Sequence, residues 1–108
     1  MAPNPPLSRR RQFQLVLESM LTGGKVYFQP PGNVKLSYPC IIYHTYRYDT
    51  SHADNILYRA QRAYTVMYID TNPDATFPET YLKTQPMTHF DREYTADNLH
   101  HWVFTTYY

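Results

Sequence analysis

The chain has 108 residues, which is enough for one domain and too few for two independent hydrophobic cores. Its single cysteine, Cys40, cannot form an internal disulfide, and no apolar run reaches the roughly 20 residues that a membrane-spanning helix needs. The net charge is +1, but six basic residues and one acidic residue give residues 1–48 a charge of +5, while four basic and eight acidic residues give residues 49–108 a charge of −4. Unless this division arises by chance, it indicates a molecule able to pair head to tail with its own copies.

The N-terminal part is predicted to be an arm followed by a helix. Residues 1–8 are proline-rich and are expected to form a flexible arm before a single domain, residues 9–108. Ser8 is predicted to cap a helix that runs from about Arg9 to Leu21. Apolar side chains at helical spacing form one stripe on this helix: Phe13, Val16, Leu17, Met20 and Leu21.

Strand signals dominate the next part of the chain. Residues 25–28 are predicted to form a short strand, which ends at a loop with two prolines and a glycine. Residues 40–49 and 59–70 are predicted to pair as an antiparallel hairpin across a polar turn at residues 50–55. Four tyrosines of this hairpin are expected to contribute to the sheet core or to subunit contacts: Tyr43, Tyr46, Tyr64 and Tyr68.

A short second helix is predicted after the hairpin. Thr76 and Glu79 have the spacing of a capping box, with proline at the first helical position, and about eight helical residues follow. Pro86 ends this helix, because proline cannot continue it.

The last two predicted strands, residues 87–95 and 100–108, are joined by a turn at Asp97-Asn98, whose side chains favour turns. The whole order predicts an α+β domain. It consists of an antiparallel sheet of about four to five strands, an N-terminal amphipathic helix and a short second helix.

The final strand is rich in aromatic side chains. Alternation places Trp102 and Phe104 on one face, where they should enter the core opposite the segment around Phe90. An aromatic strand at a free sheet edge invites aggregation, so we expect an assembly to cover that edge. Tyr107 and Tyr108 are therefore expected to be needed for folding or for assembly.

Three arginines stand at the start of the first predicted helix, where positive charge opposes the helix macrodipole: Arg9, Arg10 and Arg11. We therefore expect them to meet an acidic neighbour, either an adjacent subunit or a phosphate backbone, and a solvated basic patch is the alternative. The candidate acidic partners are expected in the loops that flank the predicted hairpin: Asp49, Asp54, Asp70 and Asp74.

Patterns of catalytic or metal-binding residues are absent from the sequence. No Cys/His pair has zinc-finger spacing, and the remaining metal alternative would combine His44, His89 and His101. Asp91 and Glu93 are expected to share a strand face, where salt bridges are favoured over acid–base catalysis. We therefore predict a protein that is not an enzyme and has no metal or cofactor.

Nucleic-acid binding is an alternative, because basic residues beside exposed aromatics can stack single strands. The nearly neutral charge and the position of the aromatic strands in the acidic half argue against a dedicated binder. That alternative predicts salt-sensitive retention on heparin.

Three stretches together resemble a family of small tailed-bacteriophage proteins that act as tail terminators, head–tail connectors or tail completion proteins. These stretches are "VYFQPPGNVKLSYPCIIY", "ADNILYRAQRAYTVMYIDTNPD" and "FDREYTADNLHHWVFTTYY". The residues of the last stretch that carry the family pattern are Phe90, Asp91, Arg92, Asp97, Asn98, Trp102, Phe104, Tyr107 and Tyr108.

The resemblance implies a structural subunit of the virion neck with a tail-terminator-like fold, assembled in the host cytoplasm. Such subunits form a ring, usually a hexamer, that ends the tail tube and joins it to the head connector. The implied partners are other copies of the chain, the tail tube protein and the connector or stopper protein, with no membrane. Genomic DNA would pass through the ring without specific binding. A head-completion or stopper role in the same neck is the alternative.

Overall fold

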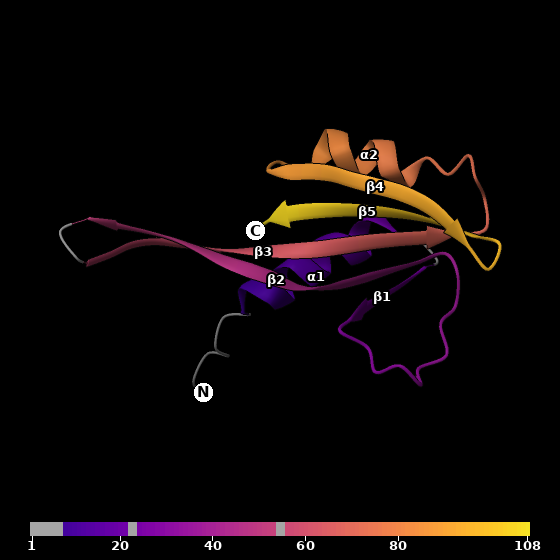
Figure 1. The fold of residues 1–108 in the computed structure, drawn as a ribbon, viewed down its shortest axis with the longest axis horizontal. Coiled ribbons are helices and arrows are strands. Elements are labelled where there is room, and N and C mark those ends of the chain that lie inside the picture. Colours follow the sequence, from indigo (N-terminus) through magenta and orange to yellow (C-terminus); the bar gives the residue numbers. More distant parts are fainter. Residues whose placement is uncertain (1–7, 22–23, 54–55) are drawn as a thin grey trace, which may run out of the picture.

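The computed structural model describes residues 8–21, 24–53 and 56–108, with side chains for all of these except residues 48–53 and 56–61. Two helices lie on one face of a five-stranded sheet (Figure 1). The elements follow in chain order as α1 (Arg9–Met20), β1 (Lys25–Phe28), β2 (Cys40–Ala53), β3 (Ile56–Asp70), α2 (Phe77–Thr84), β4 (Thr88–Ala96) and β5 (Leu99–Tyr107). This arrangement confirms the predicted α+β class with an N-terminal helix and a short second helix.

The strand order in the sheet is β1-β2-β3-β5-β4. β1 runs parallel to β2 while the other pairs are antiparallel, so the sheet is mixed rather than wholly antiparallel. Residues 29–39 return the chain from the end of β1 to the start of β2, which is the crossover that a parallel pair requires. A four-residue strand is too short for its side-chain pattern to reveal the direction in which it pairs.

The core lies between the two helices and one face of the sheet. Phe13 of α1 is fully buried, and its ring lies 5.6, 4.9 and 4.9 Å from the rings of Tyr43, Tyr64 and Tyr108. Such aromatic pairs contribute about 0.5–1.5 kcal/mol each beyond the burial of their area. The other members of this core are Leu17, Leu21, Ile41, Val66, Tyr68, Phe77, Tyr81, Trp102 and Phe104.

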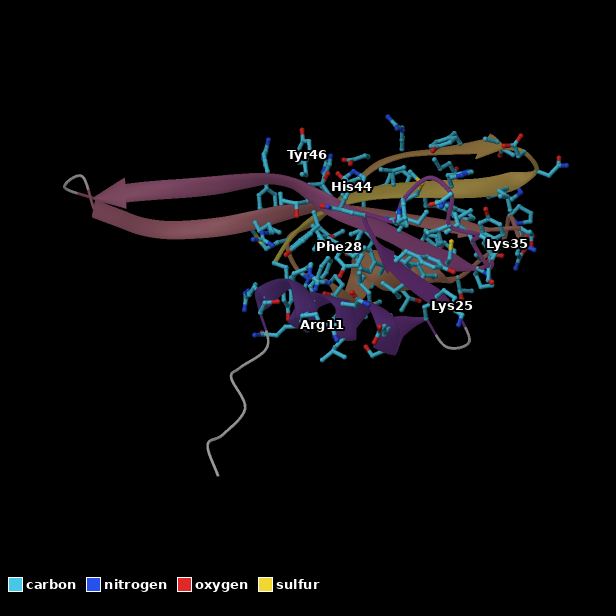
Figure 2. The ribbon with its side chains drawn as sticks, turned by 90° about the horizontal axis from the view of Figure 1, so that it is seen from below. Arg11, Lys25, Phe28, Lys35, His44 and Tyr46 are labelled. Carbon is cyan, nitrogen blue, oxygen red and sulfur yellow. The ribbon has the colours of Figure 1, made fainter. Side chains whose placement is uncertain are left out.

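The other face of the sheet turns away from α1, as His44 and Tyr46 show in Figure 2. Tyr46 is 56% exposed, because alternation from the buried Tyr43 places it on the same outer face as His44. Three of the four hairpin tyrosines join the core as expected, and Tyr46 does not.

α1 begins at the predicted residue, and the hydroxyl of Ser8 accepts a hydrogen bond from the backbone N–H of Arg11 at 3.2 Å. The helix ends at Met20, with Leu21 as its C-cap. Residues 1–7, which the sequence predicts to be an arm, lie outside the described residues. Neither α1 nor α2 is long and apolar enough to cross a membrane.

α2 has the predicted length of eight residues, but the predicted capping box does not form. The side chain of Thr76 makes no capping hydrogen bond, and Pro78 occupies the second helical position rather than the first. The helix is held instead by its buried Tyr81, whose hydroxyl lies 2.6 Å from the hydroxyl of Thr106 in β5. A contact with a strand 25 residues away cannot be read from a local motif.

The β2–β3 hairpin is longer than predicted. Backbone pairing continues to Ala53↔Ile56, so the predicted polar turn at residues 50–55 is wrong and most of that segment is strand. Polar side chains do not prevent pairing, since the ladder is made by backbone groups. β5 pairs with β3 only from Ala63 onward, and the outer part of the hairpin therefore projects beyond the sheet (Figure 1).

β5 lies in the interior of the sheet, between β3 and β4. The prediction that its aromatic edge is free is therefore wrong, since both edges of β5 are paired within the chain. The predicted turn is confirmed: Asp97 and Asn98 have φ values of 52° and 62°, which these residue types tolerate in a two-residue hairpin turn. The outer strand on this side of the sheet is β4, which is exposed along most of its length.

Cys40 is expected to resist alkylation in the folded protein. Its side chain is fully buried, and burial raises the pKa of the thiol from 9.0 to about 11. Two pKa units correspond to a roughly hundredfold lower thiolate population near neutral pH. Mass spectrometry after iodoacetamide treatment should detect slow modification without urea and rapid modification in urea. Equal rates in the two conditions would contradict the buried position.

Candidate functional site

The three arginines at the start of α1 have different environments. Arg10 is half-buried and donates a hydrogen bond to the hydroxyl of Tyr43 at 3.3 Å, so it serves its own subunit. Arg9 is exposed and its guanidinium lies 4.6 Å from the centre of the Tyr108 ring. Arg11 is exposed as well. The exposed guanidinium groups of Arg9 and Arg11 are called the arginine end below.

Neither Asp70 nor Asp74, the two predicted acidic partners whose side chains the structure describes, forms an ion pair with the arginines. Asp49 lies inside β2, where its backbone is opposite Gln61, rather than in a loop, and Asp54 lies outside the described residues. Asp70 ends β3 and accepts a hydrogen bond from the hydroxyl of Tyr68 at 2.6 Å. Asp74 belongs to an exposed acidic surface with a defined shape.

That surface is a groove of about 410 Å³ beside the start of α2, and we call it the acidic groove. Its three carboxylates come from Asp74, Glu79 and Glu93, all of them exposed. Trp102 also lines the groove and is only 7% exposed. The remaining lining residues are Pro73, Ala75, Thr76 and Pro78.

Glu93 reaches the groove because of a β-bulge. The register of β4 against β5 shifts between Phe90 and Arg92, so that Glu93 lies opposite Trp102. One extra residue reverses the side-chain alternation, and Asp91 turns instead to the hydroxyl of Thr105. The prediction that Asp91 and Glu93 share a strand face is therefore wrong. Sequence spacing alone gives no signal that Glu79 and Glu93 belong to one groove with Asp74.

The arginine end and the acidic groove are surface features that present opposite charges to other molecules. No family model and no curated protein matches this chain. The resemblance to tailed-phage neck proteins therefore remains a prediction. The geometry itself offers surfaces for protein contact, formed by α1 on one side and by α2 with β4 and β5 on the other.

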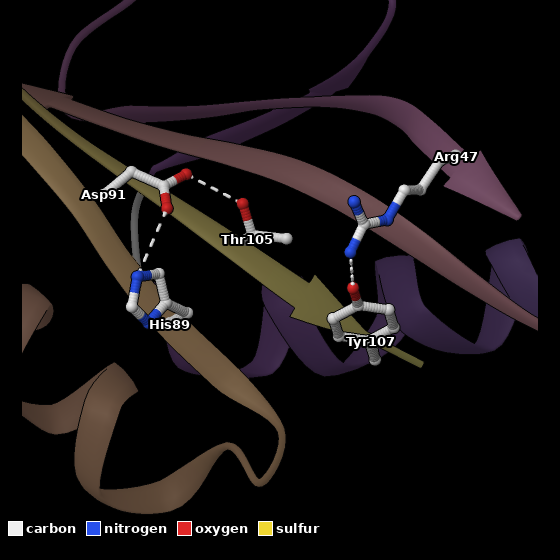
Figure 3. A network of polar contacts seen from close by, with 5 residues as sticks. All are labelled: Arg47, His89, Asp91, Thr105 and Tyr107. Carbon is white, nitrogen blue, oxygen red and sulfur yellow. Dashed lines mark hydrogen bonds and ion pairs between the residues drawn. The ribbon is translucent and has the colours of Figure 1, made fainter. Parts of the chain in front are cut away.

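The residues of the family pattern stabilise the β4–β5 hairpin. Phe90 packs edge-on against Phe104, with ring centres 5.6 Å apart. On the other face, Asp91 accepts a hydrogen bond from Thr105 at 2.7 Å and lies 4.0 Å from His89 (Figure 3). Through these contacts, Phe90 and Asp91 hold β4 against β5.

The end of the pattern links the last strand to the rest of the fold. Arg47 of β2 donates a hydrogen bond to the hydroxyl of Tyr107 (Figure 3). The backbone N–H of Tyr108 donates to the carbonyl of Arg62 at 3.1 Å. Arg92 lies 5.5 Å from the centre of the Tyr94 ring. The aromatic ending is thus in contact with β2, β3 and α1.

Burial raises the pKa of three tyrosines in the core. It raises the pKa of Tyr81 to about 12 and that of Tyr43 less, since the nearby Arg10 guanidinium favours the phenolate. The pKa of Tyr68 is raised by burial and by its hydrogen bond to Asp70. All three hydroxyls therefore remain protonated donors at neutral pH.

The histidines do not form a metal centre in the described part of the chain. No group of three histidine, cysteine or acidic side chains there is placed to hold a metal ion. His44 and His89 are exposed, while His101 stacks on Tyr94 at 4.5 Å with nearly parallel rings. This stack supports the sheet surface.

Proposed function

We propose that this chain is a structural subunit of a tailed-bacteriophage neck, where copies form a ring that ends the tail tube and joins it to the head connector. The observation that carries the proposal is the projecting β2–β3 hairpin. From Ile56 to Gln61, β3 pairs with β2 alone over about 20 Å of strand length. An isolated two-stranded ribbon is at best marginally stable in water. A hairpin of this length is suited to contact another chain.

The distribution of charge supports a ring of identical subunits. The arginine end and the acidic groove are different surfaces of one chain, and their complementarity favours head-to-tail contact. Head-to-tail contacts close into rings when the rotation between copies allows it. The six-membered ring is the size implied by the resemblance to tail terminators.

The remaining parts of the proposal follow from the place of such a ring in the virion. Its partners would be the tail tube protein on one side and the connector or stopper protein on the other, after assembly in the host cytoplasm. DNA would pass through the lumen, where basic side chains can contact phosphates without reading sequence. The subunit would act by contact and positioning, with no catalysis and no cofactor.

Electron microscopy of particles assembled without this protein tests the proposal. Overlong tails are expected, because nothing would stop polymerisation of the tail tube. Tails of normal length that are detached from heads would instead assign the head-completion or stopper role. Normal particles would contradict both neck roles. For the purified protein, native mass spectrometry is expected to detect a ring of about six copies.

A further inference from the structure

We propose that the acidic groove of one subunit binds the arginine end of another copy of the same chain. The inference rests on the proposed ring and identifies the contact between neighbouring subunits. The contact would join Arg9 and Arg11 of one copy to three acidic residues around Trp102 of the next copy: Asp74, Glu79 and Glu93.

The groove has the chemistry of a guanidinium site. None of its three carboxylates forms an ion pair with a basic side chain of the described residues. They do not converge as metal ligands either, since no three such groups in the described part of the chain are placed to hold an ion. A planar guanidinium can bind carboxylates through two parallel hydrogen bonds and lie against an aromatic ring.

Trp102 adds an aromatic residue to the lining of the groove, beside the three carboxylates. The residue is 93% buried, and its indole N–H makes no hydrogen bond within the described part of the chain. No fully buried side-chain nitrogen or oxygen there lacks a partner, so this N–H remains open to solvent. A main-chain carbonyl of an incoming segment would satisfy it, while the indole ring attracts a cation.

The arginine end has the matching chemistry. Arg9 and Arg11 are exposed and form no ion pair with a described carboxylate. Their charges lie at the N-terminus of α1, where the macrodipole is unfavourable to cations. Contact with carboxylates would offset this unfavourable interaction for Arg9 and Arg11. Arg10 already has polar partners in its own chain, Gln14 and Tyr43.

The two surfaces are too far apart to meet within one subunit. Arg9 lies over Tyr108, whereas the groove is formed at Trp102, and the six residue steps from Trp102 to Tyr108 span about 20 Å of extended strand. The arginine end of one copy therefore reaches only the groove of a different copy. Two distinct surfaces in contact make a head-to-tail interface, which is the kind that closes into rings.

Charge reversal with mixing tests the contact. Arg9→Glu with Arg11→Glu should weaken self-association about tenfold or more, and Glu79→Lys with Glu93→Lys should do the same. An equal mixture of the two variants should recover assembly, because the two altered surfaces are complementary to each other and so are the two retained surfaces. Sedimentation velocity over a range of concentrations measures the association constants of the two variants and of their mixture, for comparison with the original protein. Circular dichroism confirms that each variant is folded.

Controls separate this contact from net charge. Lys35→Glu with Arg92→Glu makes the same change in net charge as the arginine variant, at exposed positions elsewhere, and should leave association within about twofold of the original protein. Rings that persist in both reversed variants would overturn the inference and leave the neck role intact. A native protein that stays monomeric at all concentrations would overturn both. If the variants and their mixture assemble as expected but particles made without this protein are normal, only the neck role is overturned.

Discussion

Replacing Phe13 by alanine is expected to lower the free energy of unfolding by about 3–5 kcal/mol. Its fully buried ring contacts three tyrosine rings, from β2, β3 and the end of the chain, so its loss leaves a cavity that no single neighbour can fill. This loss is a large part of the about 5–15 kcal/mol that stabilises a typical domain. Urea unfolding followed by the fluorescence of Trp102, the only tryptophan, measures it.

Two further variants make the test specific. Leu15→Ala removes an apolar side chain from the same helix at a position 49% exposed, and it should cost no more than about 0.5 kcal/mol. Phe13→Leu keeps most of the apolar volume and should give an intermediate loss in a variant that still folds. Similar losses for Phe13→Ala and Leu15→Ala would show that α1 does not pack on the sheet through Phe13.

Shortening the β2–β3 hairpin is expected to abolish the ring while the subunit remains folded. The variant replaces residues 49–61 by Asn-Gly, a pair that favours a two-residue hairpin turn, and keeps the pairing of Tyr48 with Arg62. The subunit should stay stable because the removed part of β3 does not pair with β5. Native mass spectrometry should then detect only monomers, with an unchanged unfolding curve by circular dichroism.

The second hairpin provides the matched control. Replacing Asp97-Asn98 by Asn-Gly introduces the same turn between β4 and β5, where the backbone already has positive φ at both positions. That variant should form rings like the original protein. If the shortened β2–β3 variant also forms rings of the original size, the projecting hairpin is not a subunit contact and the main support for the proposed function is lost.

The features that the sequence predicts correctly depend on residues close to one another in the chain. The hydroxyl of Ser8 caps α1 through a backbone N–H three residues away, and Asp97-Asn98 makes its own turn. The predicted capping box at Thr76 fails because α2 is positioned by Tyr81 and its contact with β5, rather than by its own first turn. A local sequence motif fails to predict the structure where a contact with a segment distant in the chain is stronger.

The candidate site shows the same limit more sharply. Arg9, Arg11 and Asp74 can be selected from the sequence because their charge and position are visible there. Glu93 cannot, since strict alternation puts it on the same face as Asp91, and a bulge in β4 turns it to the opposite face, opposite Trp102. The grouping of Glu93 with Asp74 also requires α2 to lie beside β4, which is a result of packing.

By itself, the sequence determined the α+β class, the apolar stripe of α1, the β4–β5 turn and the division of charge between the two halves of the chain. Each of these depends on the periodicity or the chemistry of neighbouring residues. Only the tertiary structure decided that β1 is parallel, that β5 lies inside the sheet and that the β2–β3 hairpin projects. Strand order and pairing direction depend on which distant segments come to share backbone hydrogen bonds and one buried face, and the side-chain pattern of a single strand does not identify its partners.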